Sequence, residues 1–199
     1  MPRTIEITAY QFSELSEKAK EAAHNEHLSN GYSNDWSSEN LGSWKKFLDI
    51  FPVKSYGNSW ADIAFTGEES IENLSGQRLA TYIWNNYKKD LFKGKYYSTG
   101  GHYDGAGKYH YKFRYSKIQL QGQNCVMTGY CMDDFILAPI YAFLDRPKAN
   151  TDFMDLMNEC ANAWSKAMDG DDEWQNSIEH FADECEANEY EFDEHGKMI

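Results

Sequence analysis

Acidic residues are concentrated at one end of this chain, and the apolar residues among them are spaced as they are in helices. Residues 145–199 contain 16 Asp and Glu against 4 Lys and Arg, whereas residues 1–144 contain 16 acidic and 15 basic residues. In the acidic part, apolar residues recur three or four positions apart, from Phe153 to Ala167 and again from Trp174 to Cys185. Such spacing gives each segment one apolar face and leaves the carboxylates on the other. It predicts two acidic helices, at about 151–168 and 171–188, that meet near Gly170.

The rest of the chain mixes patterns typical of strands and of helices. Alternating or β-branched runs predict strands at 4–10, 53–65 (broken near Gly57), 108–118, 124–132 and 189–192. Apolar stripes with helix start and stop signals predict helices at 17–28, 35–50, 70–91 and 133–144, and the glycine-rich residues 96–108 predict a turn or loop. This order of elements indicates an α+β fold: one domain over 1–199, with an antiparallel sheet, packed helices and an acidic C-terminal helical pair. Within it, 1–144 is a mixed, near-neutral part and 145–199 an acidic helical part.

Composition indicates a folded chain that works in the cytosol. Hydrophobic residues make up 41% and aromatic residues 16%, which is far from a disordered composition. We find no apolar run long enough for a membrane-spanning helix and no signal-peptide core at the N-terminus. Four cysteines without a Cys-x-x-Cys pair are expected to be small buried side chains rather than disulfides.

The candidate motifs for catalysis, cofactors and metals do not match the patterns that such sites require. The glycine-rich segment 101–108 has five residues rather than four between Gly101 and Gly107, and Tyr109 stands where a P-loop needs Ser or Thr. His24 and His27 share a helix face, but a zinc site needs three or four ligands. The acids around Gly170 lack the register of a calcium loop. We therefore expect no enzyme activity, no cofactor and no metal site.

The acidic helices offer a candidate surface for binding a protein. Carboxylates on rigid helices can imitate the phosphates of DNA and occupy the basic nucleic-acid-binding surface of a partner. The alternative is that this helical face is only solvated, which explains the same composition. Exposure of Trp174 and Tyr190 would favour the interface, because aromatic side chains anchor interfaces. The candidate partner-binding residues are Asp169, Asp171, Asp172, Glu173, Glu179, Asp183, Glu184 and Glu186.

A second candidate surface lies in residues 78–117, where nine Lys and Arg stand against two acidic residues and eleven aromatic residues are interleaved with them. Basic groups suit phosphates and exposed rings suit stacked bases, so this region predicts a binder of nucleic acid or nucleotides. The alternative, which we favour from the sequence, is that the tyrosines pack in the core while the lysines meet solvent or pair with the acidic helices. The candidate nucleic-acid-binding residues are Lys108, His110, Lys112, Arg114, Tyr96, Tyr97 and Tyr103.

Three stretches resemble a family of small tailed-phage proteins, some of which are loosely labelled antitoxins of a toxin–antitoxin stability system. They are Ile7 to Lys20, with Tyr10, Phe12, Glu14, Leu15, Ser16 and Ala19; Cys125 to Asp134; and Glu186 to Lys197. The resemblance implies an accessory phage protein that acts by binding and disabling host machinery, of anti-CRISPR, anti-restriction or antitoxin type. It implies a host protein as partner and supplies no catalytic residues.

Overall fold

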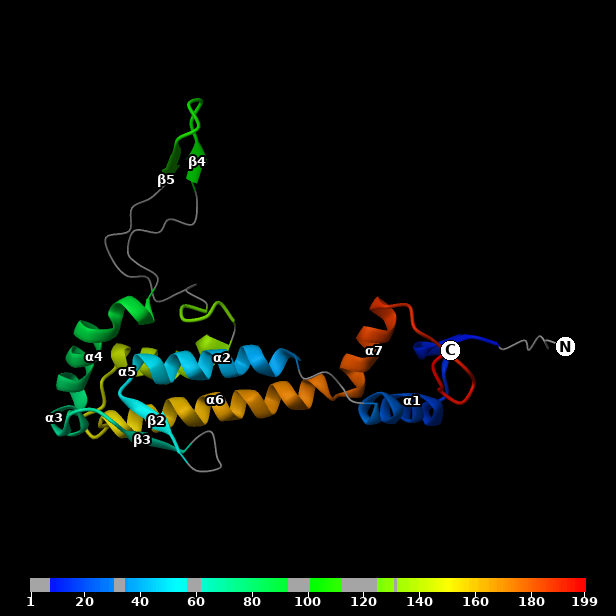
Figure 1. The fold of residues 1–199 in the computed structure, drawn as a ribbon, viewed down its shortest axis with the longest axis horizontal. Helices are drawn as coiled ribbons and strands as arrows, with labels where there is room; N and C mark the ends of the chain where they lie inside the picture. Colours follow the sequence, from blue (N-terminus) through cyan, green and yellow to red (C-terminus); the bar gives the residue numbers. More distant parts are fainter. Residues whose placement is uncertain (1–7, 31–34, 57–61, 93–100, 112–124, 131) are drawn as a thin grey trace. The chain divides into compact units, whose positions relative to one another are not determined.

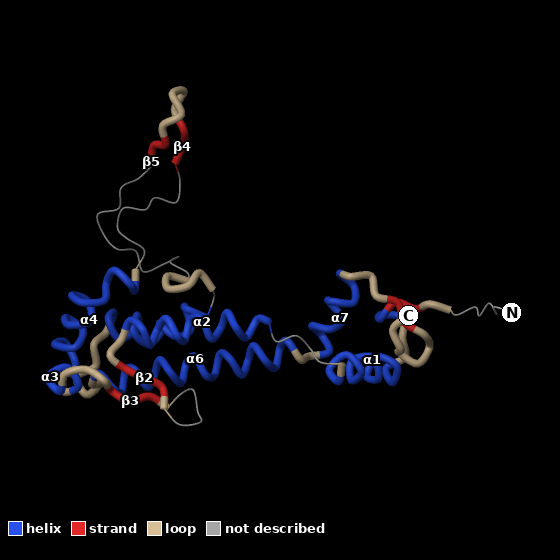
Figure 2. Tube along the Cα trace, in the orientation of Figure 1, coloured by secondary structure: helices blue, strands red, loops and turns tan. Residues whose placement is uncertain are grey.

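The protein is described here from a computed structural model, which covers residues 8–30, 35–56, 62–92, 101–111, 125–130 and 132–199 (Figure 1). Helices make up most of this described chain (Figure 2). Its helices are η1 (Phe12–Glu14), α1 (Glu17–Ser29), α2 (Asp35–Ile50), α3 (Glu69–Glu72), α4 (Gly76–Leu91), α5 (Met132–Asp145), α6 (Phe153–Gln175) and α7 (Ile178–Ala187). Its strands are β1 (Tyr10–Gln11), β2 (Val53–Ser55), β3 (Ile63–Phe65), β4 (Gly101–Tyr103), β5 (Tyr109–Tyr111) and β6 (Glu191–Phe192).

The α+β class is confirmed, with the described strands forming three small antiparallel sheets, each of two strands: β1 with β6, β2 with β3, and β4 with β5. The chain divides into two compact units. Unit 1 is Met1–Asp35 with Met168–Ile199, and unit 2 is Trp36–Ala167, so the long helix α6 begins in unit 2 and ends in unit 1.

Unit 1 brings the two ends of the sequence together. Strand β1 pairs with β6, placing Tyr10 opposite Phe192 and Gln11 opposite Glu191. Helix α1 begins as predicted, because the Oγ atom of Ser16 accepts a hydrogen bond from the Ala19 amide at 3.3 Å. Helices α1 and α7 pack with η1 around a core that consists of Phe12, Leu15, Ala19, Ala23, Phe181, Cys185 and Phe192.

The turn that follows β6 approaches α1 closely. Gly196 is buried and has φ +88°, a conformation that residues with a Cβ rarely adopt. A Cβ at this position would collide with the backbone carbonyl oxygen of Ala19. Only glycine therefore allows the C-terminal turn to pack against α1.

Unit 2 is built mainly from α2, α4, α5 and the first part of α6. The rings of Trp44 and Trp164 stack at 4.8 Å between centroids and are almost fully buried. The Trp164 indole N–H donates to the Asn40 carbonyl at 3.2 Å, so this buried polar group is satisfied. The predicted break in the 53–65 strand is confirmed as a hairpin, in which Val53 pairs with Phe65 and Ser55 with Ile63.

Three predicted elements differ in the structure. The predicted helix at 70–91 is two helices, α3 and α4, because Gly76 has φ +54° at the first position of α4 and lies against the backbone of Ala149. The glycine-rich residues 96–108, predicted as a loop, contain strand β4. The acidic helices are divided at Asn176 and Ser177, and Gly170 lies inside α6.

The predicted strand at 124–132 is wrong where the structure describes it. Cys125 to Tyr130 form an irregular loop, and Cys125 (φ 58°) and Gly129 (φ 97°) adopt left-handed backbone conformations that a strand excludes. The reason is the carboxylate of Asp133 at the start of α5, which accepts hydrogen bonds from the amides of Met127 (2.9 Å), Thr128 (2.6 Å) and Gly129 (3.3 Å). These amides converge on one side chain and are therefore not aligned with a neighbouring strand.

Of the remaining predicted strands, residues 4–7 and 112–118 lie outside the described residues. Their neighbours form β1 and β5. The predicted short strand at 189–192 is confirmed as β6. The helices predicted at 17–28, 35–50 and 133–144 are confirmed as α1, α2 and α5.

Candidate protein-binding surface

The C-terminal turn of α6 and helix α7 carry all eight predicted partner-binding residues, and all eight lie in unit 1. The joint between the two helices is closed by its own polar side chains. The Ser177 Oγ accepts a hydrogen bond from the His180 amide at 3.1 Å and donates one to the Trp174 carbonyl at 2.7 Å. Ser177 thereby caps α7 while it holds the last turn of α6.

Helix α7 separates its apolar and acidic side chains cleanly. Phe181 and Cys185 are 2% exposed and face the core of unit 1. Glu179, Asp183 and Glu186 are exposed, and their spacing of four and three residues places them on one face of the helix. Burial of the first pair therefore fixes the three carboxylates toward solvent.

The end of α6 presents a second group of carboxylates. Asp169, Asp172 and Glu173 are exposed, and their spacing of three and four residues again places them on one helix face. We call the two groups together the acidic surface; it consists of Asp169, Asp172, Glu173, Glu179, Asp183 and Glu186. Within the described residues, none of these six side chains has a hydrogen bond or an ion pair.

The other two predicted residues have different surroundings. Asp171 is half-buried on the opposite side of α6. Glu184 is also half-buried, and its Oε2 atom lies 3.8 Å from Nε2 of His27, which makes an ion pair when that histidine is protonated. The His27 ring packs on Phe181 with 4.5 Å between centroids, so Glu184 belongs to the contact between α1 and α7. We leave both residues out of the acidic surface.

An exposed aromatic side chain lies at the joint between the two acidic helix faces. Trp174 is 49% exposed, and its ring lies 5.7 Å from that of His180 in an edge-on arrangement. Tyr190, the other aromatic residue considered from the sequence, is half-buried. Exposure of Trp174 beside unpaired carboxylates is an arrangement found in interfaces, where exposed tryptophans are frequent anchors of the binding energy.

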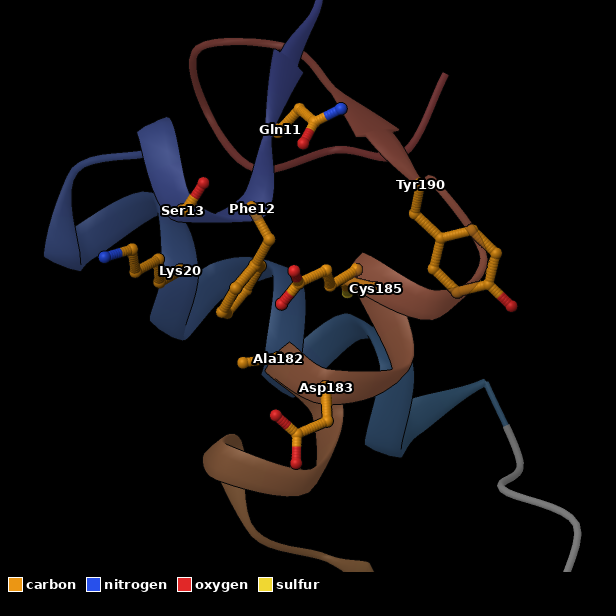
Figure 3. Close-up of a pocket in the computed structure, with 9 residues that line it drawn as sticks. Gln11, Phe12, Ser13, Lys20, Ala182, Asp183, Cys185 and Tyr190 are labelled. Atoms are coloured by element: carbon orange, nitrogen blue, oxygen red, sulfur yellow. The ribbon is translucent and has the colours of Figure 1, made fainter.

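A pocket of about 440 Å³ opens between η1 and α7, within unit 1 (Figure 3). Phe12, Ala182 and Cys185 contribute its apolar part, whereas Ser13, Lys20 and Asp183 are among its polar lining residues. Burial raises the pKa of the Cys185 thiol to about 12, so this sulfur is protonated and a poor nucleophile at neutral pH. The pocket is therefore suited to binding rather than to cysteine chemistry.

Sequence reasoning did not predict this pocket, since its walls come from opposite ends of the chain. Residues 11–20 and 182–190 meet through the pairing of β1 with β6 and through the shared core of η1, α1 and α7. The available signals were the β-branched run at 4–10 and the alternating aromatic residues at 189–192, but they did not specify the pairing. The pocket is therefore a product of the tertiary structure and could not be predicted from local sequence patterns.

The second candidate surface is described only in part. Tyr103 is 71% exposed and Lys108 is exposed, and both flank the turn between β4 and β5. That turn is held by the Asp104 carboxylate, which accepts hydrogen bonds from the amides of Ala106 and Lys108. His110 lies in β5, opposite His102. The predicted residues Tyr96, Tyr97, Lys112 and Arg114 lie outside the described residues.

Other features of the described residues bear on the remaining expectations. Free cysteines are found at Cys125, Cys160 and Cys185, the last two buried. No group of three or more His, Cys, Asp or Glu in the described ranges is placed to hold a metal ion. Among the same residues, no helix has the length and apolarity needed to cross a membrane.

Comparison with known proteins gives no relative for this chain. No protein-family model, no curated protein and no solved structure matches it.

Proposed function

We propose that this chain is a non-enzymatic binding protein whose acidic surface occupies the basic, nucleic-acid-binding surface of a partner protein. The observation that carries the proposal is the acidic surface itself: six exposed carboxylates on two rigid helix faces, without partners among the described residues, beside the exposed ring of Trp174. Leaving so many like charges unpaired costs stability through mutual repulsion, and a complementary cationic surface would relieve it.

The sequence resemblance suggests the biological setting. We propose a phage-encoded inhibitor, of anti-CRISPR, anti-restriction or antitoxin type, that acts in the cytoplasm of the infected host and disables a host defence or nucleic-acid enzyme. Inhibition would follow from occlusion, because an enzyme whose basic groove is filled by carboxylates cannot bind DNA or RNA there. This mechanism needs neither a cofactor nor a catalytic residue.

The test compares two variants that have the same net charge. The site variant neutralises the acidic surface, with Asp→Asn and Glu→Gln at Asp169, Asp172, Glu173, Glu179, Asp183 and Glu186. The control variant makes the same three Asp→Asn and three Glu→Gln changes at exposed residues elsewhere, namely Glu39, Asp49, Asp62, Glu72, Asp90 and Glu159. Both change the net charge from −13 to −7.

Wild type and both variants would be used to capture proteins from nuclease-treated host lysate. We expect a host protein to be captured in stoichiometric amount by wild type and by the control variant, and to be lost with the site variant. Capture should also weaken as salt is raised, because the contact is electrostatic. If all three proteins capture the same partner equally well, the acidic surface is not the binding site and the proposal fails.

The runner-up function is direct binding of nucleic acid or nucleotides by the basic and aromatic region. The observation in its favour is Tyr103, which has the largest exposed fraction of the large hydrophobic side chains described, at 71%, and stands near the exposed Lys108. This function predicts that labelled single-stranded RNA or DNA binds at low salt and that Tyr103→Ala weakens binding by tenfold or more. No shift of either probe at low salt would dispose of it.

A further inference from the structure

The pocket between η1 and α7 has an uneven charge distribution. Its charged residues are Lys20, Asp183 and Glu186. The Lys20 ammonium lies 3.0 Å from the Glu17 carboxylate, so its charge is already offset by a neighbour on α1. Asp183 and Glu186 have no such partner in the described part of the chain, which leaves the pocket with a net negative potential.

The apolar lining of the pocket limits which cation it suits. Phe12 is 7% exposed and Cys185 is 2% exposed, so they present a small apolar surface beside the two carboxylates. The half-buried side chain of Tyr190 also lines the pocket, at the side where α7 leads into β6 (Figure 3). An occupant that matches both the apolar lining and the carboxylates has an aliphatic stem and a cationic head. A long basic side chain fits this description better than a metal ion or a small anion does.

Arginine fits this arrangement better than lysine. Its guanidinium is planar and has five donors, so it can bond two carboxylates at once and stack on an aromatic ring. Asp183 and Glu186 are three residues apart on α7, a spacing that places them on one side of the helix, and both line the pocket. The volume of about 440 Å³ lies within the range of roughly 300–1,000 Å³ typical of ligand pockets and accommodates a single large side chain.

We propose that this pocket receives an arginine side chain of the partner protein and anchors the acidic surface to it. The inference rests on the proposed function, to which it adds the kind of residue that is recognised and its position. Asp183 and Glu186 belong to both the acidic surface and the pocket, so occupation of the pocket would place the remaining carboxylates against the basic groups around that arginine. Nucleic-acid-binding surfaces are rich in arginine, which is consistent with such a partner.

The experiment uses the full-length protein and a minimal probe, N-acetyl-arginine amide, whose neutral counterpart is N-acetyl-citrulline amide. Backbone amide resonances would be followed by NMR as each probe is added at millimolar concentrations. We expect saturable shifts at residues that line the pocket, among them Ser13, Ala182 and Cys185, with arginine but not with citrulline. The α6 residues Asp172 and Glu173 should shift at least fivefold less at the same arginine concentration.

Two double variants separate the pocket from general acidity. Asp183→Asn with Glu186→Gln removes the two carboxylates of the pocket and should weaken arginine binding at least fivefold. Glu39→Gln with Asp49→Asn removes the same net charge from exposed positions of α2, outside the acidic surface, and should leave arginine binding unchanged. A third variant, Ala182→Leu, fills the pocket while it keeps both carboxylates, and it should weaken binding as much as the first.

The outcomes distinguish this inference from the function on which it rests. Arginine shifts that spread equally over α6 and α7, equal shifts with citrulline, or binding that survives both pocket variants would overturn the inference. Host-protein capture that depends on the acidic surface would then still support the proposed function. If arginine occupies the pocket but the site variant captures the host protein as well as wild type does, the proposed function fails. The assignment of the arginine to a partner protein then fails with it.

Discussion

Replacing Asp133 with alanine should destabilise unit 2 more than any change at a neighbouring carboxylate. Asp133 is 0% exposed. Its Oδ2 atom accepts three backbone amides, and its Oδ1 atom accepts the Thr128 hydroxyl at 2.8 Å. The Thr128 hydroxyl in turn lies 3.1 Å from the hydroxyl of the buried Ser43 on α2. One carboxylate therefore ties an irregular loop to α5 and, through Thr128, to α2.

The magnitude follows from counting what each substitution leaves unpaired. In Asp133→Ala the Thr128 hydroxyl can turn to Ser43, but the amides of Met127, Thr128 and Gly129 lose their acceptor. An unsatisfied buried donor costs about 1–3 kcal/mol. Gly129 is exposed and its amide can bind water instead, so the other two amides give an expected loss of about 2–6 kcal/mol. In Asp133→Asn the amide oxygen keeps all three N–H partners, but the new NH2 group cannot accept from the Thr128 hydroxyl, which must turn to Ser43. Together with the lost charge assistance, we expect a loss of about 1–3 kcal/mol.

Asp134→Ala is the matched control at the adjacent position. Asp134 is half-buried and accepts a single amide hydrogen bond, from Cys125 at 3.0 Å, so its removal should cost about 1 kcal/mol. Urea unfolding followed by tryptophan fluorescence would measure all three variants, since the stacked Trp44 and Trp164 report on unit 2. Hydrogen exchange should also accelerate at Met127, Thr128 and Gly129 in Asp133→Ala. A loss for Asp133→Ala no larger than that for Asp134→Ala would refute the reasoning.

Two further predictions concern unit 1. Gly196→Ala should lower the free energy of unfolding by at least about 2 kcal/mol, because the new Cβ meets the Ala19 carbonyl at a positive φ. Gly170→Ala, at an open position inside α6, should instead raise the free energy of unfolding by about 0.5–1 kcal/mol. Thermal unfolding would measure both variants, and a change of the same sign in the two would contradict the prediction. The raised pKa of Cys185 predicts that iodoacetamide at pH 7.5 modifies this buried thiol only after the protein is unfolded in urea. The half-buried Cys125 should react in the native protein. Equal rates of modification at the two cysteines in the native protein, measured by mass spectrometry, would contradict this prediction.

Local sequence signals identified most helices and the nature of the acidic surface. Ser16 before Glu17, Pro52 after Ile50 and the apolar stripe through Phe181 and Cys185 are local features, and each produced its expected helix boundary or buried face. Exposure of Glu179, Asp183 and Glu186 followed from the same helical spacing. Helix periodicity is set by the backbone itself, which is why these elements could be predicted without knowledge of the fold.

Other features depend on residues distant in sequence or on a single buried polar group, and only the tertiary structure decided them. The run from Cys125 to Tyr130 has the composition of a strand, yet the Asp133 carboxylate outweighs that preference by collecting the amides of the segment. Pairing of β1 with β6 closes the pocket between η1 and α7, and burial against His27 withdraws Glu184 from the acidic surface. Sequence alone thus determined which helix faces are apolar and which are acidic. Long-range contacts, whose energies no local pattern encodes, decided which carboxylates remain free and where the pocket opens.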